Sequence, residues 1–579
     1  MRYHVLAVDY DGTLALNGRV DASTLKAMNK FLATGRHLLM VTGRELPDLL
    51  AAFPQIDLFE WIVAENGGLL YRPSTKEERL IAEPPSEKLI QALQRRGVAP
   101  LSIGRSILAT WHPHETVVLE TIRDLGLDLQ VIFNKGAVMI LPAGVNKATG
   151  FAAAVKEMGF SAHNVVGIGD AENDLAFLRK CEFSAAVFNA LQAVKDSVDL
   201  VTKTDHGGGV AELIERIVAD DLVSLEAQLK RHYIPLGTHD DEEILIPAYG
   251  ASVLICGPSQ SGKSTVAKRV VEGIIEQKYQ FCLIDPEGDY EAFEGAEVLG
   301  GPNGIPQLDE VCHLLENPAA NIVICLTGMS IPDRPRFFLG VMTQLLQMRV
   351  RTGRPHWLIM DEAHHLMPAE WLPQAGLLLE QLHNTVMITV QPNLLAEAVL
   401  ERVNTVIAVG ANASQTIESF AIAAKLTPPV SAVTQLEKGE VLFWRSDSGS
   451  PPISVRAYPN KMEHHRHHRK YAEGELPADR CFYFHGPEGK LNLRAQNLFS
   501  FLDLADGVDD ATWEYHLSRG DYTRWFRESI KDDPLADEGK RITNLPNLSA
   551  QESRKQMRTA VEKFYTLPAS MPMPVPGAS

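Results

Sequence analysis

Two groups of residues in this chain have the types and spacing needed for phosphoryl-group chemistry. The first group combines residues 9–13, which read DYDGT, with residues 169–174, which read GDAEND. The second combines the loop at residues 257–265, GPSQSGKST, with Asp361 and Glu362. Carboxylates suit the first group to cleaving a phosphomonoester through an aspartyl-phosphate. The glycine-rich loop with its lysine suits the second to binding and hydrolysing a nucleoside triphosphate.

The first group contains the parts that phosphomonoester cleavage requires. Such an ester resists attack because its anionic oxygens repel a nucleophile, so an enzyme supplies a nucleophile, a proton donor and a cation. Asp9 is the expected nucleophile, and Asp11 is expected to donate and later withdraw the proton. Thr42 is expected to hydrogen-bond the phosphoryl oxygens and Lys147 to neutralise them. Because Mg²⁺ prefers hard oxygen ligands, its expected ligands are Asp9, Asp11, Asp170 and Asp174. Solvated loop carboxylates would explain any one pair, whereas the ordered set favours a site.

The second group fits a phosphate-binding loop at every specified position. In such a loop backbone amides surround the phosphates, while the lysine contacts the β- and γ-phosphates and the following hydroxyl binds Mg²⁺. The lysine is Lys263 and the hydroxyl is that of Ser264. The sequence therefore predicts ATP and Mg²⁺ as cofactors of this group. The expected nucleotide contacts are Gly257, Ser259, Ser261, Gly262, Lys263, Ser264, Thr265 and Asp361.

Asp361 and two further polar residues complete the expected nucleotide site. Asp361 follows an apolar strand and is expected to bind Mg²⁺ together with Ser264. Glu362 is expected to orient or deprotonate the attacking water. Gln391 follows another apolar strand, at residues 384–390, and is placed to sense the γ-phosphate.

Apolar strands must position both groups. Residues 4–8, 38–41 and 164–168 are apolar runs that end just before polar residues of the first group. Open α/β sheets bind ligands at the carboxyl ends of their strands. The expected fold class is therefore α/β: a Rossmann-like core with an inserted α+β cap, then a RecA-like P-loop domain, then a small helical module. The expected boundaries are 1–222 with the cap at about 73–141, 223–459, a basic linker at 460–478, the helical module at 479–550 and a disordered tail at 551–579.

Composition restricts the class of protein. The 579 residues are 45% hydrophobic, which is typical of globular proteins with several domains. No apolar run approaches the roughly 20 residues of a membrane span, and the six cysteines form no CxxC pair. We therefore expect a cytoplasmic protein with reduced thiols. The net charge of −18 argues against extensive coating of nucleic acid, although a local basic groove remains compatible with it.

The first group resembles the haloacid dehalogenase-like phosphatases, in particular the capped sugar-phosphatase branch. The resemblance covers residues 1 to about 222, with all four motifs in order. It implies a Mg²⁺-dependent phosphatase whose cap selects the substrate. Nothing in the sequence names that substrate.

The second group is similar to the HerA/FtsK ATPases over residues 232–458. The similarity includes residues 284–290, IDPEGDY, and residues 389–392, TVQP. It implies a ring, with a hexamer favoured, in which an arginine of a neighbouring subunit completes each ATP site; the candidates are Arg402, Arg445 and Arg456. The amino-terminal barrel usual in HerA is missing. Either a DNA-threading pore or a solvated helix face would account for Arg334, Arg336, Arg349, Arg351 and Arg354.

These observations leave three functional hypotheses open. The leading one is a bifunctional phosphatase and ring-forming ATPase motor that acts on a phosphorylated small molecule or nucleic-acid end, with DNA as a possible partner. The second is a kinase–phosphatase acting on one substrate class. The third is a phosphatase gated by an ATP-dependent assembly domain. The aromatic and arginine residues near the carboxyl end suit either partner binding or the core of a helical module.

Overall fold

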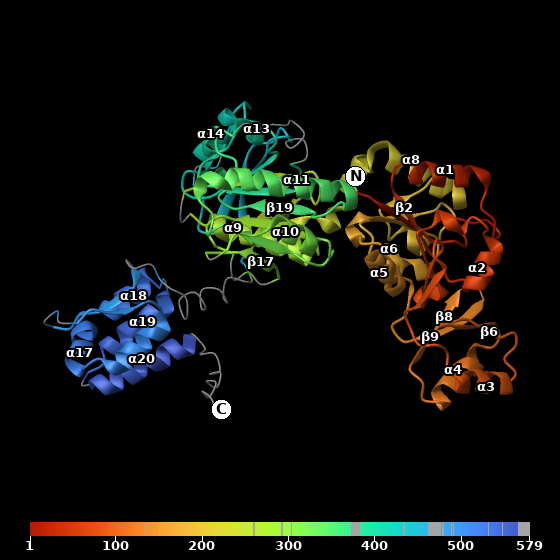
Figure 1. Cartoon of the computed structure of the whole chain (residues 1–579), viewed down its shortest axis with the longest axis horizontal. Coiled ribbons are helices and arrows are strands. Elements are labelled where there is room, and N and C mark those ends of the chain that lie inside the picture. Colours follow the sequence, from red (N-terminus) through yellow and green to blue (C-terminus); the bar gives the residue numbers. More distant parts are fainter. Residues whose placement is uncertain are drawn as a thin grey trace, which may run out of the picture. The chain divides into compact units, whose positions relative to one another are not determined.

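The computed structural model divides the chain into two compact units, residues 1–459 and 460–579 (Figure 1). We call residues 1–222 the first region and residues 223–459 the second region of the larger unit. The structure describes residues 1–564 except for residues 135, 259, 260, 291, 292, 294, 303, 372–381, 432, 434, 461–475, 477–479, 488, 490, 531 and 547. The expected basic linker at 460–478 lies almost entirely outside the described residues.

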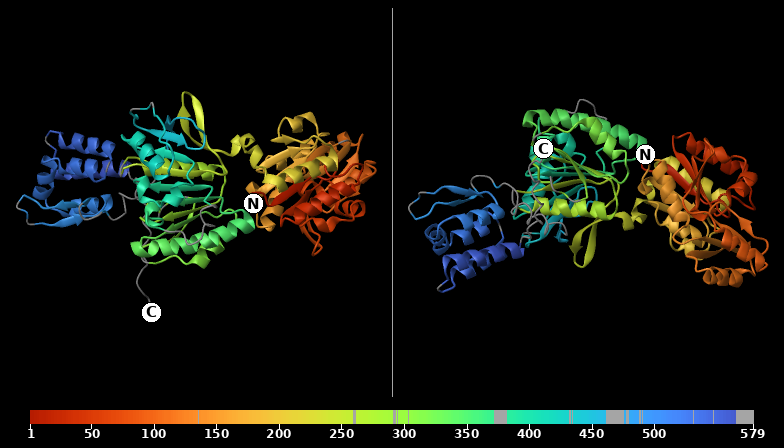
Figure 2. Two further views of the ribbon diagram at one scale, coloured as in Figure 1. Left: turned by 90° about the horizontal axis from the view of Figure 1, so that it is seen from above. Right: turned by 60° about the horizontal axis from the view of Figure 1, so that its bottom comes forward.

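The first region is built on a sheet that has eight strands among the described residues. Strands β12 to β3 are parallel, and β4 and β5 extend one edge in antiparallel fashion. The inner strands are buried along their whole length because helices cover the sheet (Figure 2). In spatial order the strands are β12 (Leu200–Val201), β11 (Phe183–Ala186), β10 (Val165–Gly169), β1 (Val5–Val8), β2 (His37–Val41), β3 (Trp61–Ala64), β4 (Leu69–Arg72) and β5 (Glu77–Leu80).

Two helices of the first region, α1 and α5, begin at side-chain caps. Asp21 accepts hydrogen bonds from the backbone amides of Ser23 and Thr24 at the start of α1, and Asn146 forms a capping box at the start of α5. The second cap fixes where Lys147, the first residue of α5, enters the core. The helices are α1 (Ala22–Leu32), α2 (Leu46–Ala52), α5 (Lys147–Glu157), α6 (Leu175–Leu178), α7 (Gln192–Lys195) and α8 (His206–Asp220).

An α+β cap is inserted between β5 and α5. Its four-stranded antiparallel sheet packs on two helices through a small core of its own that includes Leu93, Val118 and Ile140. The cap elements are α3 (Glu87–Arg95), β6 (Ser102–Ile103), β7 (Leu108–Trp111), α4 (Glu115–Asp124), β8 (Leu129–Asn134) and β9 (Ala137–Pro142).

The second region contains a mixed sheet that has eleven strands among the described residues. Strands β21 to β17 are parallel, whereas β14, β13, β23 and β22 form an antiparallel extension. Strand β20 lies between β15 and β19. In spatial order the strands are β14 (Glu242–Ile246), β13 (Ile234–His239), β23 (Ile453–Ala457), β22 (Glu440–Arg445), β21 (Thr405–Ala408), β15 (Ser252–Cys256), β20 (Thr385–Thr389), β19 (Trp357–Met360), β16 (Phe281–Asp285), β18 (Ile322–Cys325) and β17 (Glu297–Gly300).

Helices flank this second sheet, and two short 3₁₀ turns join it to the first region. The turns are η5 (Val223–Gln228) and η6 (Lys230–His232). The helices are α9 (Lys263–Glu276), α10 (Leu308–Leu315), α11 (Arg334–Thr352), α13 (Glu397–Leu400) and α14 (Ala413–Ala423). The fold class expected from the sequence is confirmed for both regions.

The carboxyl-terminal unit is a hairpin with a helical bundle. Its aromatic residues form its own core, in which Phe501 is fully buried and Trp513 stacks on Tyr522 with ring centroids 4.5 Å apart. The expected disordered tail at 551–579 is wrong for its first part, because α20 packs Met557 and Val561 into this core. The elements are β24 (Phe482–Phe484), β25 (Leu493–Ala495), α16 (Leu498–Gly507), α17 (Asp510–Ser518), α18 (Asp521–Glu528), α19 (Asp533–Thr543) and α20 (Ala550–Phe564).

Candidate functional site

The first site lies where strands β1 and β10 end. Parallel pairing of these neighbouring strands places Asp9 and Asp170 at the same edge of the sheet. Carboxylate oxygens of Asp9, Asp170 and Asp174 all lie within 4.8 Å of one another, and the three side chains are buried. These oxygens are hard donors, so the cluster fits Mg²⁺.

Lys147 is placed at the centre of this acidic cluster. Its Nζ donates hydrogen bonds to Asp9 Oδ1 and Asp174 Oδ1, each at 2.6 Å. The lysine is 3% exposed, and the two carboxylates raise its pKa against the effect of burial. Burial raises the pKa of Asp9, and Asp174 raises it further while Lys147 opposes the shift. One lysine therefore compensates only part of the charge of three carboxylates, which favours binding of a cation.

Local backbone geometry holds the other two carboxylates. Asp174 Oδ2 accepts the backbone N–H groups of Asp170 and Ala171, both at 3.0 Å, and Thr13 Oγ1 donates to Asp170 Oδ1 at 2.9 Å. Gly12 has φ +90°, and a Cβ there would lie 2.4 Å from Asp170 Oδ2. Only glycine allows this close approach of the loop to the carboxylate.

The structure does not bring the Asp11 side chain into the carboxylate cluster. Its two oxygens instead accept hydrogen bonds from Arg44 Nε at 2.6 Å and Nη2 at 2.8 Å. Arg44 also pairs with Asp48 at 2.7 Å. Two parallel N–H groups of a guanidinium bind the two oxygens of a carboxylate in a strong bidentate pair. The Asp11 side chain is therefore held by Arg44 and is not one of the grouped carboxylates, in contrast to its expected role as a side-chain ligand. Thr42 is buried at the end of β2.

Sequence reasoning missed a turn that connects the core to the cap. Residues 65–67 all have positive φ. The buried Glu65 accepts hydrogen bonds from the backbone N–H groups of Arg105 and Ser106 in the cap, at 3.0 and 2.7 Å. Asn66 accepts from Asn173 at 3.2 Å, beside the carboxylate cluster. The signal was the sequence ENGG directly after a strand, because asparagine and glycine tolerate the left-handed region.

The second site lies between β15 and α9. Gly257 has φ +153°, and a Cβ there would lie 2.2 Å from the carbonyl oxygen of Val409. The buried Lys263 donates to the carbonyl oxygen of Pro258 at 3.2 Å, so it folds back over its own loop. Ser264 is exposed in the first turn of α9, followed by Thr265, and Ser261 is half-buried before it. Ser259 lies outside the described residues.

Asp361 and Glu362 end strand β19 beside this loop. Burial raises the pKa of Asp361 to about 8, with Asp285, Asp289 and Glu362 adding to the shift. Among the described residues, Glu362 Oε2 is buried and accepts no hydrogen bond, although His364 Nδ1 lies 3.4 Å from it, and Glu362 has φ +38°. Gln391 is exposed just beyond β20.

Two residues near Glu362 were not predicted from the sequence. His364 Nδ1 lies 3.4 Å from Glu362 Oε2 and 3.2 Å from Thr389 Oγ1. Thr389 ends strand β20, which lies between the strands of the loop and of Asp361. A contact of this kind depends on strand order, and strand order is not visible in the spacing of the sequence.

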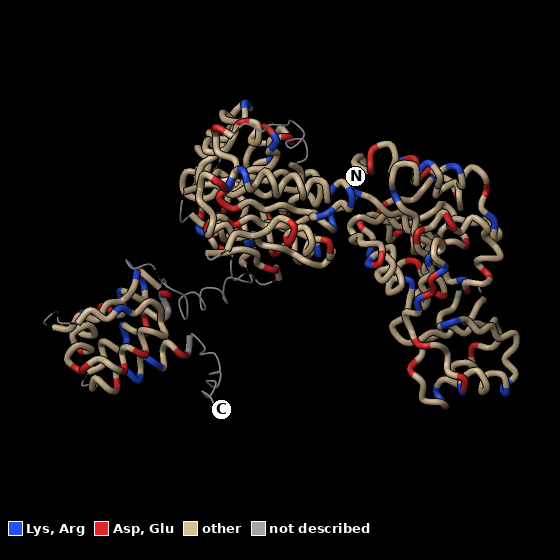
Figure 3. The backbone as a smooth tube through the Cα atoms, viewed as in Figure 1, with Lys and Arg blue, Asp and Glu red and all other residues tan. Residues whose placement is uncertain are grey.

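Arg349 and Arg354, two of the five arginines considered for a pore, are buried and hold backbone carbonyl groups of their own chain. Arg349 is buried and donates to the carbonyl oxygens of Pro355, His356 and His383. Arg354 is buried and donates to the carbonyl oxygen of Gly159 in the first region at 2.7 Å. Basic and acidic residues are interspersed over both regions in the view of Figure 3. Of the arginines considered for completing a neighbour's site, Arg445 and Arg456 pair with acidic residues of their own chain.

The first site and its fold define a class: a capped α/β hydrolase with an aspartate at a strand end, followed by a P-loop nucleotide-binding domain. The family model described as haloacid dehalogenase-like hydrolase matches residues 6–104 and 116–214, and a model described as AAA domain matches residues 248–396. The chain belongs to the haloacid dehalogenase-like hydrolase family. It is an enzyme that joins a phosphatase domain to an AAA ATPase domain.

Relatives and solved structures match the first region. A protein of Methanothermobacter thermautotrophicus named phosphoglycolate phosphatase is 31% identical over 222 residues, covering 37% of this chain and 98% of that protein. Phosphoglycolate phosphatase 2 of Saccharolobus solfataricus is also 31% identical over 222 residues, covering 37% and 92%. The crystal structure of a haloacid dehalogenase-like hydrolase from Bacteroides thetaiotaomicron matches with 19% identity and a TM-score of 0.34, covering 37% and 99%. In the part of the chain that the structure describes, no helix is long and apolar enough to cross a membrane.

Proposed function

We propose that the first region is a Mg²⁺-dependent phosphomonoesterase that forms an aspartyl-phosphate on Asp9. The observation that carries this proposal is the single buried cluster in which Lys147 Nζ lies 2.6 Å from Asp9 and from Asp174. A buried aspartate at a strand end, held by a lysine, is preorganised to attack a phosphorus atom. Asp9, Asp170 and Asp174 would hold the ion, and bound Mg²⁺ would neutralise charge on the phosphoryl oxygens.

The roles of the other residues follow from their positions. Asp9 supplies the nucleophilic oxygen, and Lys147 stabilises negative charge on the transferred group. Thr42 supplies a hydroxyl for a phosphoryl oxygen. Asp11 pairs with Arg44 and lies outside the group of Asp9, Asp170 and Asp174, so we assign it the leaving-group proton rather than the ion; proton transfer requires the Arg44 pair to open.

The substrate that we propose for the first region is a small phosphorylated carboxylic acid, with phosphoglycolate as the first compound to test. This proposal is supported by relatives named phosphoglycolate phosphatase, which the chain matches over almost their whole length. The test is a phosphatase screen over phosphoglycolate, sugar phosphates, nucleotides and phosphorylated DNA ends. Asp9→Asn should abolish turnover, and Asp128→Asn, an exposed cap residue, should not. Turnover by Asp9→Asn at the wild-type rate would contradict the assignment.

For the second region we propose ATP hydrolysis by a ring-forming assembly of the HerA/FtsK type, with a hexamer favoured. The proposal is supported by the sequence similarity over residues 232–458 and by the strand order β15, β20, β19, which places Asp361 and Glu362 near the phosphate-binding loop. Lys263, Ser264 and Asp361 would bind Mg²⁺·ATP, and Glu362 would orient water. Mass measurement with and without ATP tests assembly, and stimulation of ATPase activity by DNA tests action on nucleic acid. A monomer at every ATP concentration would contradict the ring.

The kinase–phosphatase hypothesis is less well supported, because the Asp361 and Glu362 pair is of the kind that orients and deprotonates water. Labelled γ-phosphate should therefore appear as inorganic phosphate. Transfer of the label to a phosphatase product would favour the kinase instead. The assembly-gate hypothesis is favoured if ATP binding changes the phosphatase rate without steady ATP turnover.

A further inference from the structure

A group of metal-binding side chains lies outside both phosphoryl-transfer sites. It combines His163 in the turn before β10, Glu182 before β11 and His232 at the end of η6. One nitrogen of each histidine and one oxygen of the glutamate all lie within 4.8 Å of one another. Glu182 is 1% exposed. These residues are far apart in the sequence, so only the tertiary structure brings them together.

The hydrogen bonds of His163 require a cation on one side of its ring. Nε2 lies 2.9 Å from the carbonyl oxygen of Gln277, which can only accept, so Nε2 must carry the hydrogen. Nδ1 lies 2.6 Å from Glu182 Oε2. In a neutral ring with hydrogen on Nε2, Nδ1 has a lone pair, which would then face a carboxylate lone pair. Either a proton or a metal ion must therefore lie between these two atoms.

The third side chain favours a metal ion over a proton. His232 Nδ1 lies 3.6 Å from the same oxygen of Glu182, and its Nε2 is buried without a hydrogen-bond partner among the described residues. A proton joins two atoms, whereas three donor atoms converge here. A tetrahedral zinc site with bonds of about 2.0–2.1 Å separates its ligand atoms by about 3.3 Å, and the present separations of 2.6 and 3.6 Å bracket that value. The separation between the two histidine nitrogens is within 4.8 Å, so side-chain adjustment would be needed to complete such a site.

We propose that His163, Glu182 and His232 form a binding site for a divalent transition metal, with Zn²⁺ the favoured occupant. Two imidazole nitrogens with one carboxylate oxygen form a donor set typical of zinc, unlike the all-oxygen cluster around Asp9. The carbonyl of Gln277 fixes the His163 ring in the tautomer that leaves Nδ1 free to bind a metal.

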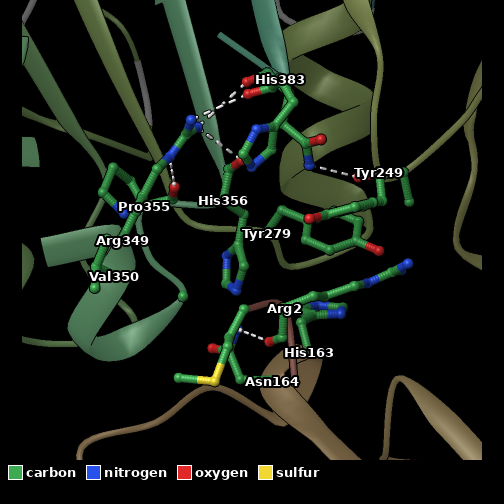
Figure 4. A pocket seen from close by; sticks show the side chains of 14 residues that line it. Arg2, His163, Asn164, Tyr249, Tyr279, Arg349, Val350, Pro355, His356 and His383 are labelled. Atoms are coloured by element: carbon green, nitrogen blue, oxygen red, sulfur yellow. Dashed lines mark hydrogen bonds between the residues drawn. The ribbon is translucent and has the colours of Figure 1, made fainter. Parts of the chain in front are cut away.

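The surrounding residues make this site a junction between the two regions. Tyr279 donates to Glu182 Oε1 at 2.9 Å, and Arg2 pairs with Glu182 and with Glu226, so the guanidinium charge is compensated. Figure 4 shows His163, Arg2, Tyr279 and His356 lining one pocket of about 180 Å³. His356 Nε2 in this pocket is buried and has no partner among the described residues. The fourth position of the ion would be taken by water or by a group from this pocket. A bound ion would link the connector at residues 223–233, through His232, to His163 and Glu182 of the first region.

The test measures zinc bound to the full-length chain. Because residues 464, 465, 467 and 468 are histidines that could also bind zinc, all four are replaced by glutamine in the background chain. The chain is stripped with a chelator and dialysed against Zn²⁺ with excess Mg²⁺, which competes at the oxygen sites. We expect the background to retain one more zinc per chain than the same chain with His232→Gln. The matched control, His112→Gln, changes an exposed cap histidine and should keep the full zinc content.

A second readout identifies the ligands. Co²⁺ in a tetrahedral site with nitrogen ligands gives visible absorption, which should be present in the background and lost in both His163→Gln and His232→Gln. Phosphatase and ATPase rates of each variant verify that it is folded. If His163→Gln does not fold, the variant His232→Gln still tests whether the three residues bind a metal ion. Equal zinc content in the background and in folded His232→Gln would overturn the proposal and leave a proton between His163 and Glu182.

Discussion

His163 Nε2 lies 2.9 Å from the carbonyl oxygen of Gln277, so the two α/β regions meet through a residue that precedes β10 and one that follows α9. Strand β10 ends at the carboxylate cluster, and α9 begins at the phosphate-binding loop. The two candidate sites are thus linked by one strand and one helix that touch at their far ends.

Replacing Lys147 should abolish most phosphatase activity. Lys147→Ala removes the only ammonium in hydrogen-bond distance of Asp9 and Asp174 among the described residues. We expect kcat/KM to fall by about 100-fold or more, as for loss of a preorganised charge-stabilising donor. Lys156→Ala, an exposed lysine of the same helix, is the control. An unchanged kcat/KM in Lys147→Ala would remove this residue from the site.

Two glycine substitutions separate steric conflict from backbone strain. Gly12→Ala places a Cβ 2.4 Å from Asp170 Oδ2 at φ +90°, whereas Gly35→Ala, at φ +82°, meets nothing within 4 Å. Both should lower the free energy of unfolding by about 1 kcal/mol or more through strain. Only Gly12→Ala should also lower phosphatase activity and Mg²⁺ affinity. Phosphatase assays and denaturant unfolding measure both quantities, and equal activity in the two variants would contradict the steric argument.

Glu362→Gln should separate nucleotide binding from hydrolysis. The amide cannot deprotonate or polarise water as a carboxylate does, whereas Lys263 and Ser264 remain to bind the phosphates. We expect ATP turnover to fall by about 100-fold while nucleotide affinity changes little. Lys263→Ala should lose affinity as well. Binding of a fluorescent ATP analogue and release of phosphate measure the two effects, with Glu310→Gln, exposed in α10, as the control.

Glu65 should control how the cap engages substrate. Its carboxylate accepts two cap backbone N–H groups, so Glu65→Ala leaves them unpaired and loosens the cap on the core. We expect KM to rise several-fold with a smaller change in kcat. Steady-state kinetics measure this split. Glu87→Ala, which alters an exposed cap glutamate, should leave both parameters unchanged.

The first region should lose stability as the pH falls below about 6.5. Burial lowers the pKa of His4 from 6.5 to about 4, the amino terminus adds to this shift, and Asp221 opposes it. The unfolded chain therefore binds a proton at higher pH than the folded one, so its population grows as pH falls from 6.5 to 4. Between pH 7 and pH 5 the free energy of unfolding should drop by about 2 kcal/mol from this residue. Denaturant unfolding of His4→Phe should show a flatter pH dependence than wild type or His112→Asn.

The order of the motifs was enough to predict the α/β class of both regions and most residues of the first site. Asp9, Asp170 and Asp174 follow apolar strands, and parallel strands bring such residues to one edge of a sheet. The pairing of Asp11 with Arg44 could not be read from the sequence, because both residues follow strands and either could have faced the cluster. The contact of His364 with Glu362 and Thr389 likewise depends on β20 lying between β15 and β19.

The sequence by itself determined which chemistry each region contains, because strand ends, glycine loops and carboxylate spacing are local properties of the chain. Only the tertiary structure decided what joins the regions: Arg2, His163, Glu182, His232 and Gln277 come from five separate segments. Their meeting depends on how complete domains pack, and no local pattern encodes that packing. The same reason explains why α20 was expected to be disordered. Its sequence is mostly polar, and only a few apolar residues pack into the core of the carboxyl-terminal unit.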